Sequence, residues 1–151
     1  MKQRIYIDTS VIGGCFDKEF KEWSDDLFNE FSKGLKIAVI SDITLDELEL
    51  AREEVRNQIE KIPLASREYI LNDKETEDLA DQYIKEKAVS SKFYEDALHI
   101  AIATIHKVDV LVSWNFKHIV NLDRIRKYNA VNLMNGYAMI EIRNPREILN
   151  K

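Results

Sequence analysis

Three short runs of apolar residues stand out along the chain, each rich in β-branched side chains. They are Ile5–Ile7, Ile37–Ile40 and Val110–Val112. Because every position in these runs is apolar, each one predicts a strand that is buried on both faces of a sheet. A weaker strand is predicted at Met139–Ile142.

Helical periodicity fills the segments between these runs. Within the segment from Trp23 to Lys33, the residues Trp23, Leu27 and Phe31 recur at a spacing of four, which predicts one apolar helix face. Further helices are predicted at Thr44–Val55, at Glu75–Lys87, from a cap at Ser91 to His106, and after Asn144-Pro145. Since strands alternate with helices and need cover on both faces, we expect a three-layer α/β/α sandwich with a mostly parallel sheet.

Length and composition place this pattern in a globular protein. The 151 residues are enough for one domain and too few for two ordinary ones, so we expect a single domain over residues 1–151. With 45% hydrophobic and 32% charged residues, the composition is that of a folded chain rather than a disordered one. No apolar run approaches the roughly 18 residues of a membrane span, and the start lacks a signal-peptide core. We therefore expect a cytoplasmic protein without membrane association.

The net charge of −5 is unevenly distributed along the chain. Residues 1–98 carry 14 Lys and Arg against 23 Asp and Glu, whereas residues 99–151 carry 8 against 4. An acidic total argues against generic affinity for nucleic acids. The cluster of Arg124, Arg126 and Lys127 could contact phosphates locally or be ordinary surface.

Polar side chains follow each of the three apolar runs. Asp8, Thr9 and Ser10 follow the first run, Ser41, Asp42 and then Glu47 follow the second, and Ser113, Trp114 and Asn115 follow the third. Asp96 lies near the start of the helix that leads into the third run. Because ligands of open parallel sheets bind outside the carboxyl ends of the strands, these side chains are predicted to meet there. The residues expected to converge are Asp8, Glu47, Asp96 and Asn115.

Each of these residues also has a local explanation. Asp8 could cap the turn after its strand, Glu47 could complete a capping box with Thr44, and Asn115 could be a turn residue. Asp96 could interact with the helix dipole, which contributes only about 0.3–1 kcal/mol. That is less than an unpaired buried carboxylate costs, so this explanation requires Asp96 to reach water. Local roles do not account for three acids and an amide at one predicted edge.

A divalent metal ion is the counter-charge that the sequence favours at this edge. Like charges gather only where something compensates them, and no Lys or Arg stands in the turn after Asp8. Oxygen ligands select a hard cation such as Mg²⁺, which takes few carboxylates and keeps several waters. Such an ion supports hydrolysis of a phosphodiester bond.

The polar motifs together resemble those of PIN domains, and more narrowly those of VapC-type toxin ribonucleases. The matching residues are Asp8-Thr9-Ser10-Val11-Ile12, Ser41 with Glu47, Asp96-Ala97 with Ala101, Ser113 to Ile119, and Asn144 to Leu149. Each motif is short, but the set spans nearly the whole chain in the family's order.

The resemblance implies a Rossmann-like fold, Mg²⁺- or Mn²⁺-dependent cleavage of RNA, a homodimer, and a small antitoxin partner that blocks the site. It implies that Asp8, Glu47 and Asp96 are metal ligands and that Ser10 or Thr9 orients Asp8 or a metal-bound water. Asn115 stands where the family commonly has Asp, and His118 stands where it often has an acidic residue. These departures remove up to two negative charges and bear on whether the site holds one metal ion or two.

Two other functions stay open on the sequence alone. A phosphatase of the haloacid-dehalogenase type also has an Asp after its first strand, but that mechanism needs a second Asp where this chain has Ser10. A non-catalytic PIN-like module that binds RNA or protein is favoured by Asn115.

The remaining candidate residues are predicted to have structural rather than functional roles. His99 and His106 are predicted to be surface residues, and Cys15 lacks a basic neighbour that would activate its thiol. Trp23, Phe28 and Phe31 are predicted to pack in the core or in a dimer.

Overall fold

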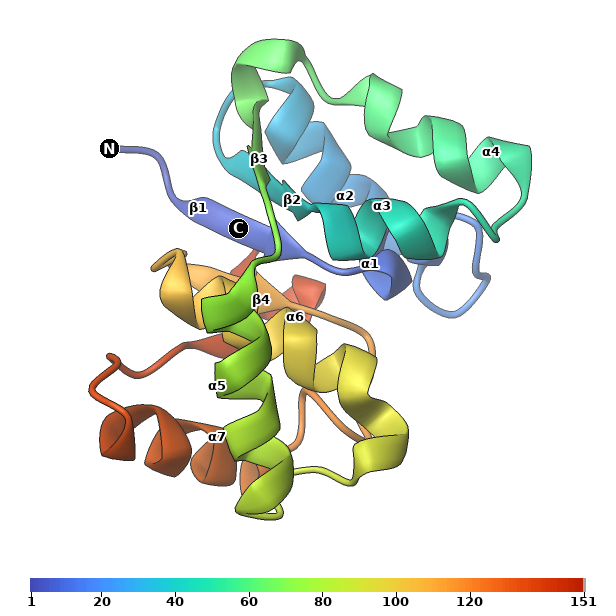
Figure 1. The fold of residues 1–151 in the computed structure, drawn as a ribbon. Coiled ribbons are helices and arrows are strands. Elements are labelled where there is room, and N and C mark those ends of the chain that lie inside the picture. Colours follow the sequence, from blue (N-terminus) through green and yellow to red (C-terminus); the bar gives the residue numbers. More distant parts are fainter. Residues whose placement is uncertain (151) are drawn as a thin grey trace.

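Five strands form one sheet in the structure, a computed structural model in which residues 1–150 are described. The order across the sheet is β3-β2-β1-β4-β5, and all four neighbouring pairs are parallel (Figure 1). The strands are β1 (Arg4–Ile7), β2 (Ile37–Ser41), β3 (Arg67–Ile70), β4 (Val110–Val112) and β5 (Ile142–Arg143). The α/β fold with a parallel central sheet, predicted from the sequence, is confirmed.

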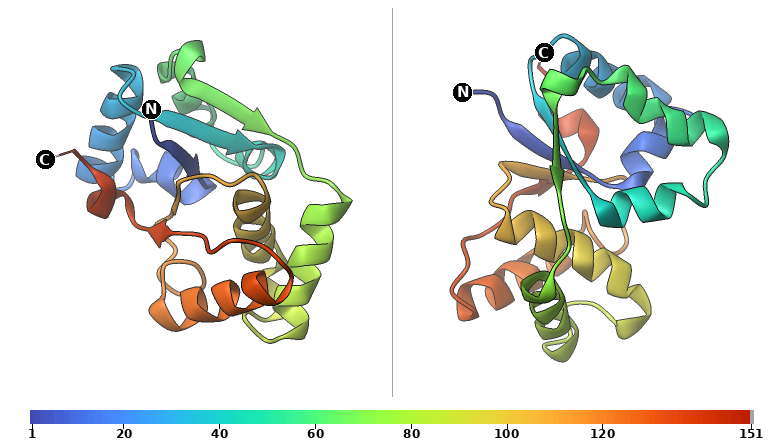
Figure 2. Two further views of the ribbon diagram at one scale, coloured as in Figure 1. Left: turned by 90° about the vertical axis from the view of Figure 1, so that its left-hand side faces the viewer. Right: turned by 45° about the horizontal axis from the view of Figure 1, so that its top comes forward.

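Helices cover the sheet on two sides. The α-helices are α1 (Thr9–Gly14), α2 (Lys21–Ser32), α3 (Asp42–Leu48), α4 (Glu53–Arg56), α5 (Lys74–Lys85), α6 (Tyr94–Ile105) and α7 (Leu122–Met134). Short 3₁₀ helices are η1 (Asn57–Lys61), η2 (Leu64–Ser66), η3 (Ser91–Phe93) and η4 (Pro145–Ile148). Figures 1 and 2 show α2 and α4 on one side of the sheet and α5, α6 and α7 on the other.

Alternate side chains of the central strands enter different cores. Ile5 and Ile7 of β1 lie in a core formed with α1, α2 and α4, whereas Tyr6 lies in a core formed with α5, α6 and α7. The same alternation holds in β4, where Leu111 faces α6 and its two neighbours face the other way. This period of two on a strand buried on both faces explains why the runs are apolar at every position.

Side-chain caps start several of these helices. Asp8, Ser41, Asp73 and Asn121 each accept a hydrogen bond from a backbone N–H in the first turn of α1, α3, α5 and α7. Asn144 and Glu147 form a complete capping box at η4, so the helix start predicted at Asn144-Pro145 is confirmed.

The helix predicted at Thr44–Val55 is wrong as one continuous element. It ends at Leu48, and α4 begins only at Glu53. The break lies at Arg52, whose backbone is extended (φ −60°, ψ 151°), so the chain leaves the helical conformation before α4 begins. Ile43 of α3 enters the core beside α6, whereas Leu48 and Val55 enter the core beside α2.

Strand β3 and the helices α1 and α7 were not predicted. Strand β3 is an edge strand in which only Ile70 is buried, so it carries no apolar run. Helix α7 buries Asn129 and Asn132 beside Tyr128, and these buried amides hide its periodicity. The weak strand expected at Met139–Ile142 is shorter and shifted, forming β5 at Ile142–Arg143.

In the part of the chain that the structure describes, no helix is long and apolar enough to cross a membrane.

Two adjacent glycines in α1 are expected to respond oppositely to alanine. A Cβ at Gly14 would lie 2.7 Å from Nε1 of Trp114, whereas a Cβ at Gly13 would meet nothing within 4 Å. Gly14→Ala should therefore cost about 1–3 kcal/mol through overpacking, and Gly13→Ala should gain up to about 1 kcal/mol through helix propensity. Denaturant unfolding of both variants measures the difference. Equal effects would show that α1 does not pack on Trp114 as described.

Candidate active site

The carboxyl ends of β1, β2 and β4 lie at one edge of the sheet because the strands are parallel. Strand β1 lies between β2 and β4. The chain passes from β1 to β2 and β3 on one side of it, and then crosses back to β4 and β5 on its other side. Crevices at such a reversal of strand order are where open α/β sheets bind ligands.

Asp8 occupies the end of the central strand and is 5% exposed. Its carboxylate accepts hydrogen bonds from the Ser10 hydroxyl at 2.6 Å, the Ser113 hydroxyl at 2.5 Å and the Val11 N–H at 3.2 Å. Burial raises the pKa of Asp8, although the charge of His99 and these hydrogen bonds act in the opposite direction. Asp8 therefore caps α1, and its hydrogen bonds do not fully compensate its buried charge.

Serine hydroxyls tie the loop after β4 to the start of α1. Besides donating to Asp8, the Ser10 hydroxyl accepts from the Trp114 N–H at 2.8 Å, and the Ser113 hydroxyl accepts from the Asn115 N–H at 2.9 Å. The first and fourth motifs, more than a hundred residues apart, are thus joined around one carboxylate.

Asp96 lies in the first turn of α6 and faces Asn115, whose Nδ2 donates to it at 3.4 Å. Burial raises the pKa of Asp96 to about 6, and the charges of Asp8 and Glu47 add to this effect against the opposing charge of His99. No other hydrogen bond to this carboxylate is formed within residues 1–150. Asn115 also has the turn role considered above, since its Oδ1 accepts from the N–H groups of Lys117 and His118.

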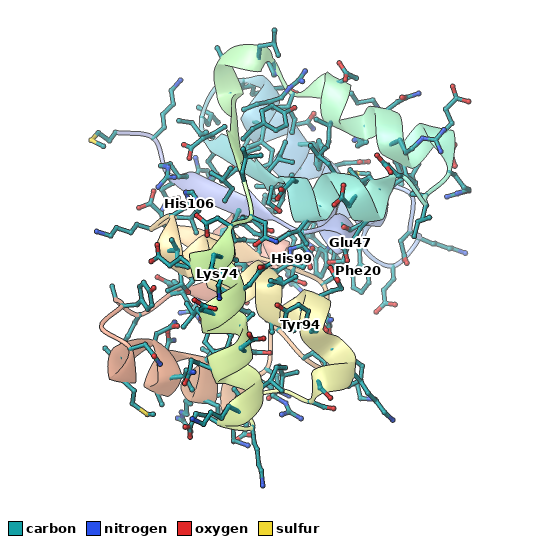
Figure 3. The ribbon with its side chains drawn as sticks, viewed as in Figure 1. Phe20, Glu47, Lys74, Tyr94, His99 and His106 are labelled. Carbon is teal, nitrogen blue, oxygen red and sulfur yellow. The ribbon has the colours of Figure 1, made fainter. Side chains whose placement is uncertain are left out.

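Glu47 has a partner that the sequence interpretation did not find. Its Oε1 lies 2.7 Å from Nε2 of His99 and accepts from the Thr9 hydroxyl at 2.8 Å. Figure 3 labels Glu47 and His99, which approach each other from α3 and α6. The capping box expected with Thr44 is wrong, because Ser41 caps α3 and the Glu47 side chain turns toward α6. The surface position predicted for His99 is also wrong, because its side chain is 2% exposed.

A chain of hydrogen bonds fixes the proton on Nδ1 of His99. At its far end Thr44 donates to the Ile7 carbonyl at 3.3 Å, so Thr44 must accept from the Ser41 hydroxyl at 3.4 Å. Ser41 has then used its only proton and accepts from the Tyr6 hydroxyl at 2.7 Å. Tyr6 has used its proton in turn, so Nδ1 of His99, 2.6 Å away, must be a donor.

His99 is therefore a cation inside the protein. Its Nε2 faces the Glu47 carboxylate, which can only accept, so both ring nitrogens carry a proton. Burial by itself lowers the pKa of His99, but Tyr6, Glu47 and Asp8 raise it well above its usual value. Burial likewise acts to raise the pKa of Glu47, but the bonds from His99 and Thr9 outweigh it and the pKa is lowered. Glu47 is compensated by a resident cation, whereas Asp96 is not.

The structure thus divides the residues predicted for the site into two sets. Asp8, Ser10, Asp96 and Asn115 lie together at the ends of β1 and β4, and Thr9 joins Glu47 and His99 instead of Asp8. Within residues 1–150, no group of three or more His, Cys, Asp or Glu side chains is placed to hold a metal ion. Mg²⁺ binds through one or two carboxylates and keeps its waters, so it needs no larger group than Asp8, which has three donors, and Asp96, which has one.

Sequence reasoning missed His99 and Tyr6 as parts of this edge, and it placed Ser113 there without its hydrogen bond to Asp8. A signal for His99 was present, because it lies three residues after Asp96 and so shares a helix face with it. Tyr6 gave no such signal, because a tyrosine within an apolar run is predicted to be a core residue. The assignments of Phe28, Phe31 and Cys15 agree with the structure: the two phenylalanines are buried, and burial raises the pKa of the Cys15 thiol to about 12.

Comparison with known proteins identifies the fold. No protein-family model and no curated protein matches the sequence. Among solved structures, the chain is similar to Mycobacterium tuberculosis VapC20, described as a sarcin–ricin loop cleaving toxin, with a TM-score of 0.56. The likeness covers 91% of this chain and 98% of VapC20 at 11% sequence identity. This protein has a PIN-like fold. The resemblance seen in the motifs is therefore matched by the order and direction of the strands.

Glu47→Gln in the PIN-like fold is expected to lower the stability of the metal-free protein. The substitution leaves the buried His99 cation without its counter-charge, and breaking one partner of a partly exposed pair should cost roughly 1–3 kcal/mol. Urea unfolding in EDTA measures the change, with Glu49→Gln at the exposed end of α3 as the matched control. A gain in stability would mean that Glu47 belongs with the repelling carboxylates.

Asp96→Asn is expected to do the opposite, in a pH-dependent way. The folded pKa of about 6 lies above the ordinary 3.8, so the folded state holds this proton more tightly and loses stability as pH rises between these values. Asn removes that loss, so the metal-free variant should be more stable than wild type by roughly 1–2 kcal/mol at pH 8, after discounting for solvent screening. The difference should vanish below about pH 4. Unfolding free energies across pH test this, and a difference independent of pH would contradict it.

Proposed function

We propose that this protein is a ribonuclease that hydrolyses RNA phosphodiester bonds with Mg²⁺ or Mn²⁺. The observation that carries the proposal is the pair Asp8 and Asp96, two buried or half-buried carboxylates whose charges oppose each other at the sheet edge. A site of this kind favours a cation, because a bound cation removes the repulsion and replaces lost solvation.

Asp8 and Asp96 would hold the metal ion, with Asn115 able to offer a neutral oxygen or bind one of the ion's waters. Ser10 and Ser113 hold Asp8 in one orientation through two hydroxyl donors. Glu47 would contribute charge from a distance while its carboxylate stays bonded to His99 and Thr9. A divalent ion supplies water activation and neutralises charge that develops on a phosphoryl oxygen.

RNA as the substrate and a toxin role for this protein are proposed from its similarity to VapC20. VapC20 has a similar fold and is described as a cleaving toxin, and four of the motifs that resemble those of VapC-type ribonucleases, around Asp8, Glu47, Asp96 and Ser113, lie at the sheet edge. We therefore extend the proposal to a toxin of a type II toxin–antitoxin pair, with a small protein antitoxin and a homodimer as partners. A single domain over residues 1–151 in the cytoplasm is part of the same proposal.

The test compares Asp96→Asn with Glu95→Gln, its exposed neighbour on α6. Wild type and Glu95→Gln should cleave single-stranded RNA, and Mn²⁺ at 100 times its Kd should stabilise both by about 2.7 kcal/mol. Asp96→Asn should lose the Mn²⁺ response and at least about 100-fold in cleavage rate. Because this variant should be no less stable without metal, the loss cannot be attributed to unfolding.

Substrate choice separates the remaining functions. Hydrolysis of p-nitrophenyl phosphate but not RNA would replace the proposal by a phosphatase. RNA binding without cleavage in Mn²⁺ would replace it by a binding module.

A further inference from the structure

A pocket lies beside the two carboxylates, and neither carboxylate is part of its lining. Its volume is about 350 Å³, at the lower end of the range of roughly 300–1,000 Å³ for small-ligand pockets. Ser10 and Asn115 line it, and these are the residues that bind Asp8 and Asp96. A group in this pocket would therefore be a direct neighbour of whatever reacts at the carboxylates.

The pocket has an aromatic wall that is already fixed in place. Phe20, labelled in Figure 3, stacks on Trp114 with ring centroids 4.2 Å apart and planes inclined by 15°. Trp114 donates through Nε1 to Ser24 at 2.8 Å and packs against Gly14. Phe116 meets Trp114 edge-on at 6.1 Å, and its side chain is 47% exposed although it is large and apolar. The aromatic surface thus continues from the pocket to the outside.

The rest of the lining favours a flat ligand. Gly13 is only half-buried and carries no side chain, so a planar ring can approach the backbone of α1 there. Asp17 adds one polar group at the rim. An aromatic wall opposite bare backbone, with a few polar groups, is suited to an unpaired nucleobase, because single-stranded RNA is recognised by stacking its bases on aromatic side chains.

We propose that this pocket binds the base of a nucleotide next to the phosphodiester bond that is cut. The inference deepens the proposed function and rests on it, because it takes the Asp8 and Asp96 edge as the place of cleavage. Stacking in this pocket would hold the RNA single-stranded at the site and fix the neighbouring phosphate against the carboxylates.

Gly13→Leu is the decisive variant. Gly13 lines the pocket and a Cβ there meets nothing within 4 Å, so a leucine is expected to occupy pocket space without disturbing the packing of α1. Ala65→Leu is the matched control, since it adds the same side chain at an exposed position before β3, at the opposite edge of the sheet. Urea unfolding first establishes that both variants are folded.

The experiment measures binding of a short labelled single-stranded RNA by anisotropy, with Ca²⁺ in place of Mn²⁺. The same RNA is prepared with one abasic nucleotide at each position in turn. Removal of the base at one position should weaken wild-type and Ala65→Leu binding about 10-fold or more. Gly13→Leu should bind the intact RNA as weakly as wild type binds that abasic RNA, and the abasic change should then have no further effect.

The outcomes separate this inference from the proposed function. The inference is overturned if, at every position, removal of the base weakens RNA binding by wild type no more than RNA binding by Gly13→Leu. The pocket would then be assigned to an apolar side chain of a protein partner. Cleavage of the same RNA in Mn²⁺ is scored independently. If Gly13→Leu abolishes the dependence of binding on the base, base binding in the pocket is supported even when the RNA is not cut. If Gly13→Leu cleaves the RNA as fast as wild type and no base effect is seen, only the nuclease proposal is supported.

Discussion

The buried carboxylate of Asp8 constrains the whole functional edge of the sheet. It sits at the end of the strand that is covered on both faces, so water cannot solvate it, and an isolated buried charge costs several kcal/mol. The Ser10 and Ser113 hydroxyls reduce that cost only if α1 and the loop after β4 meet at this point. The solvation of one side chain therefore fixes the relative position of two segments that are far apart in the sequence.

The three acids near this edge are compensated in different ways, and this difference assigns their roles. Glu47 is matched by the His99 cation, which a chain of hydroxyls orients through Tyr6. Asp96 has only a long hydrogen bond from the Asn115 amide. Glu47 consequently stabilises the fold, whereas the burial of Asp96 and the acidic charges beside it favour its binding of a proton, or of a cation if one is present.

The aromatic pocket and the carboxylates are mechanically linked through Ser10 and Trp114. The Ser10 hydroxyl binds both the Asp8 carboxylate and the Trp114 backbone, and Trp114 supports Phe20. Recognition and chemistry would then share one rigid element, which is how a site holds a reacting group in place without relying on a mobile loop.

The sequence by itself determined the fold class and the edge of the sheet at which the polar residues gather. Apolar runs such as Ile5–Ile7 can only be strands buried on both faces, and polar residues directly after them must lie at one edge once the strands are parallel. The edge strand β3 and helix α7 escaped prediction because partly exposed strands and buried amides such as Asn132 lack apolar periodicity. Only the tertiary structure decided which partner each acid has. Glu47 lies 52 positions from His99, and no pattern along the chain shows that α3 and α6 bring them to 2.7 Å. Local spacing fixes which face of an element a residue occupies, but the charge that it meets there depends on how the elements pack.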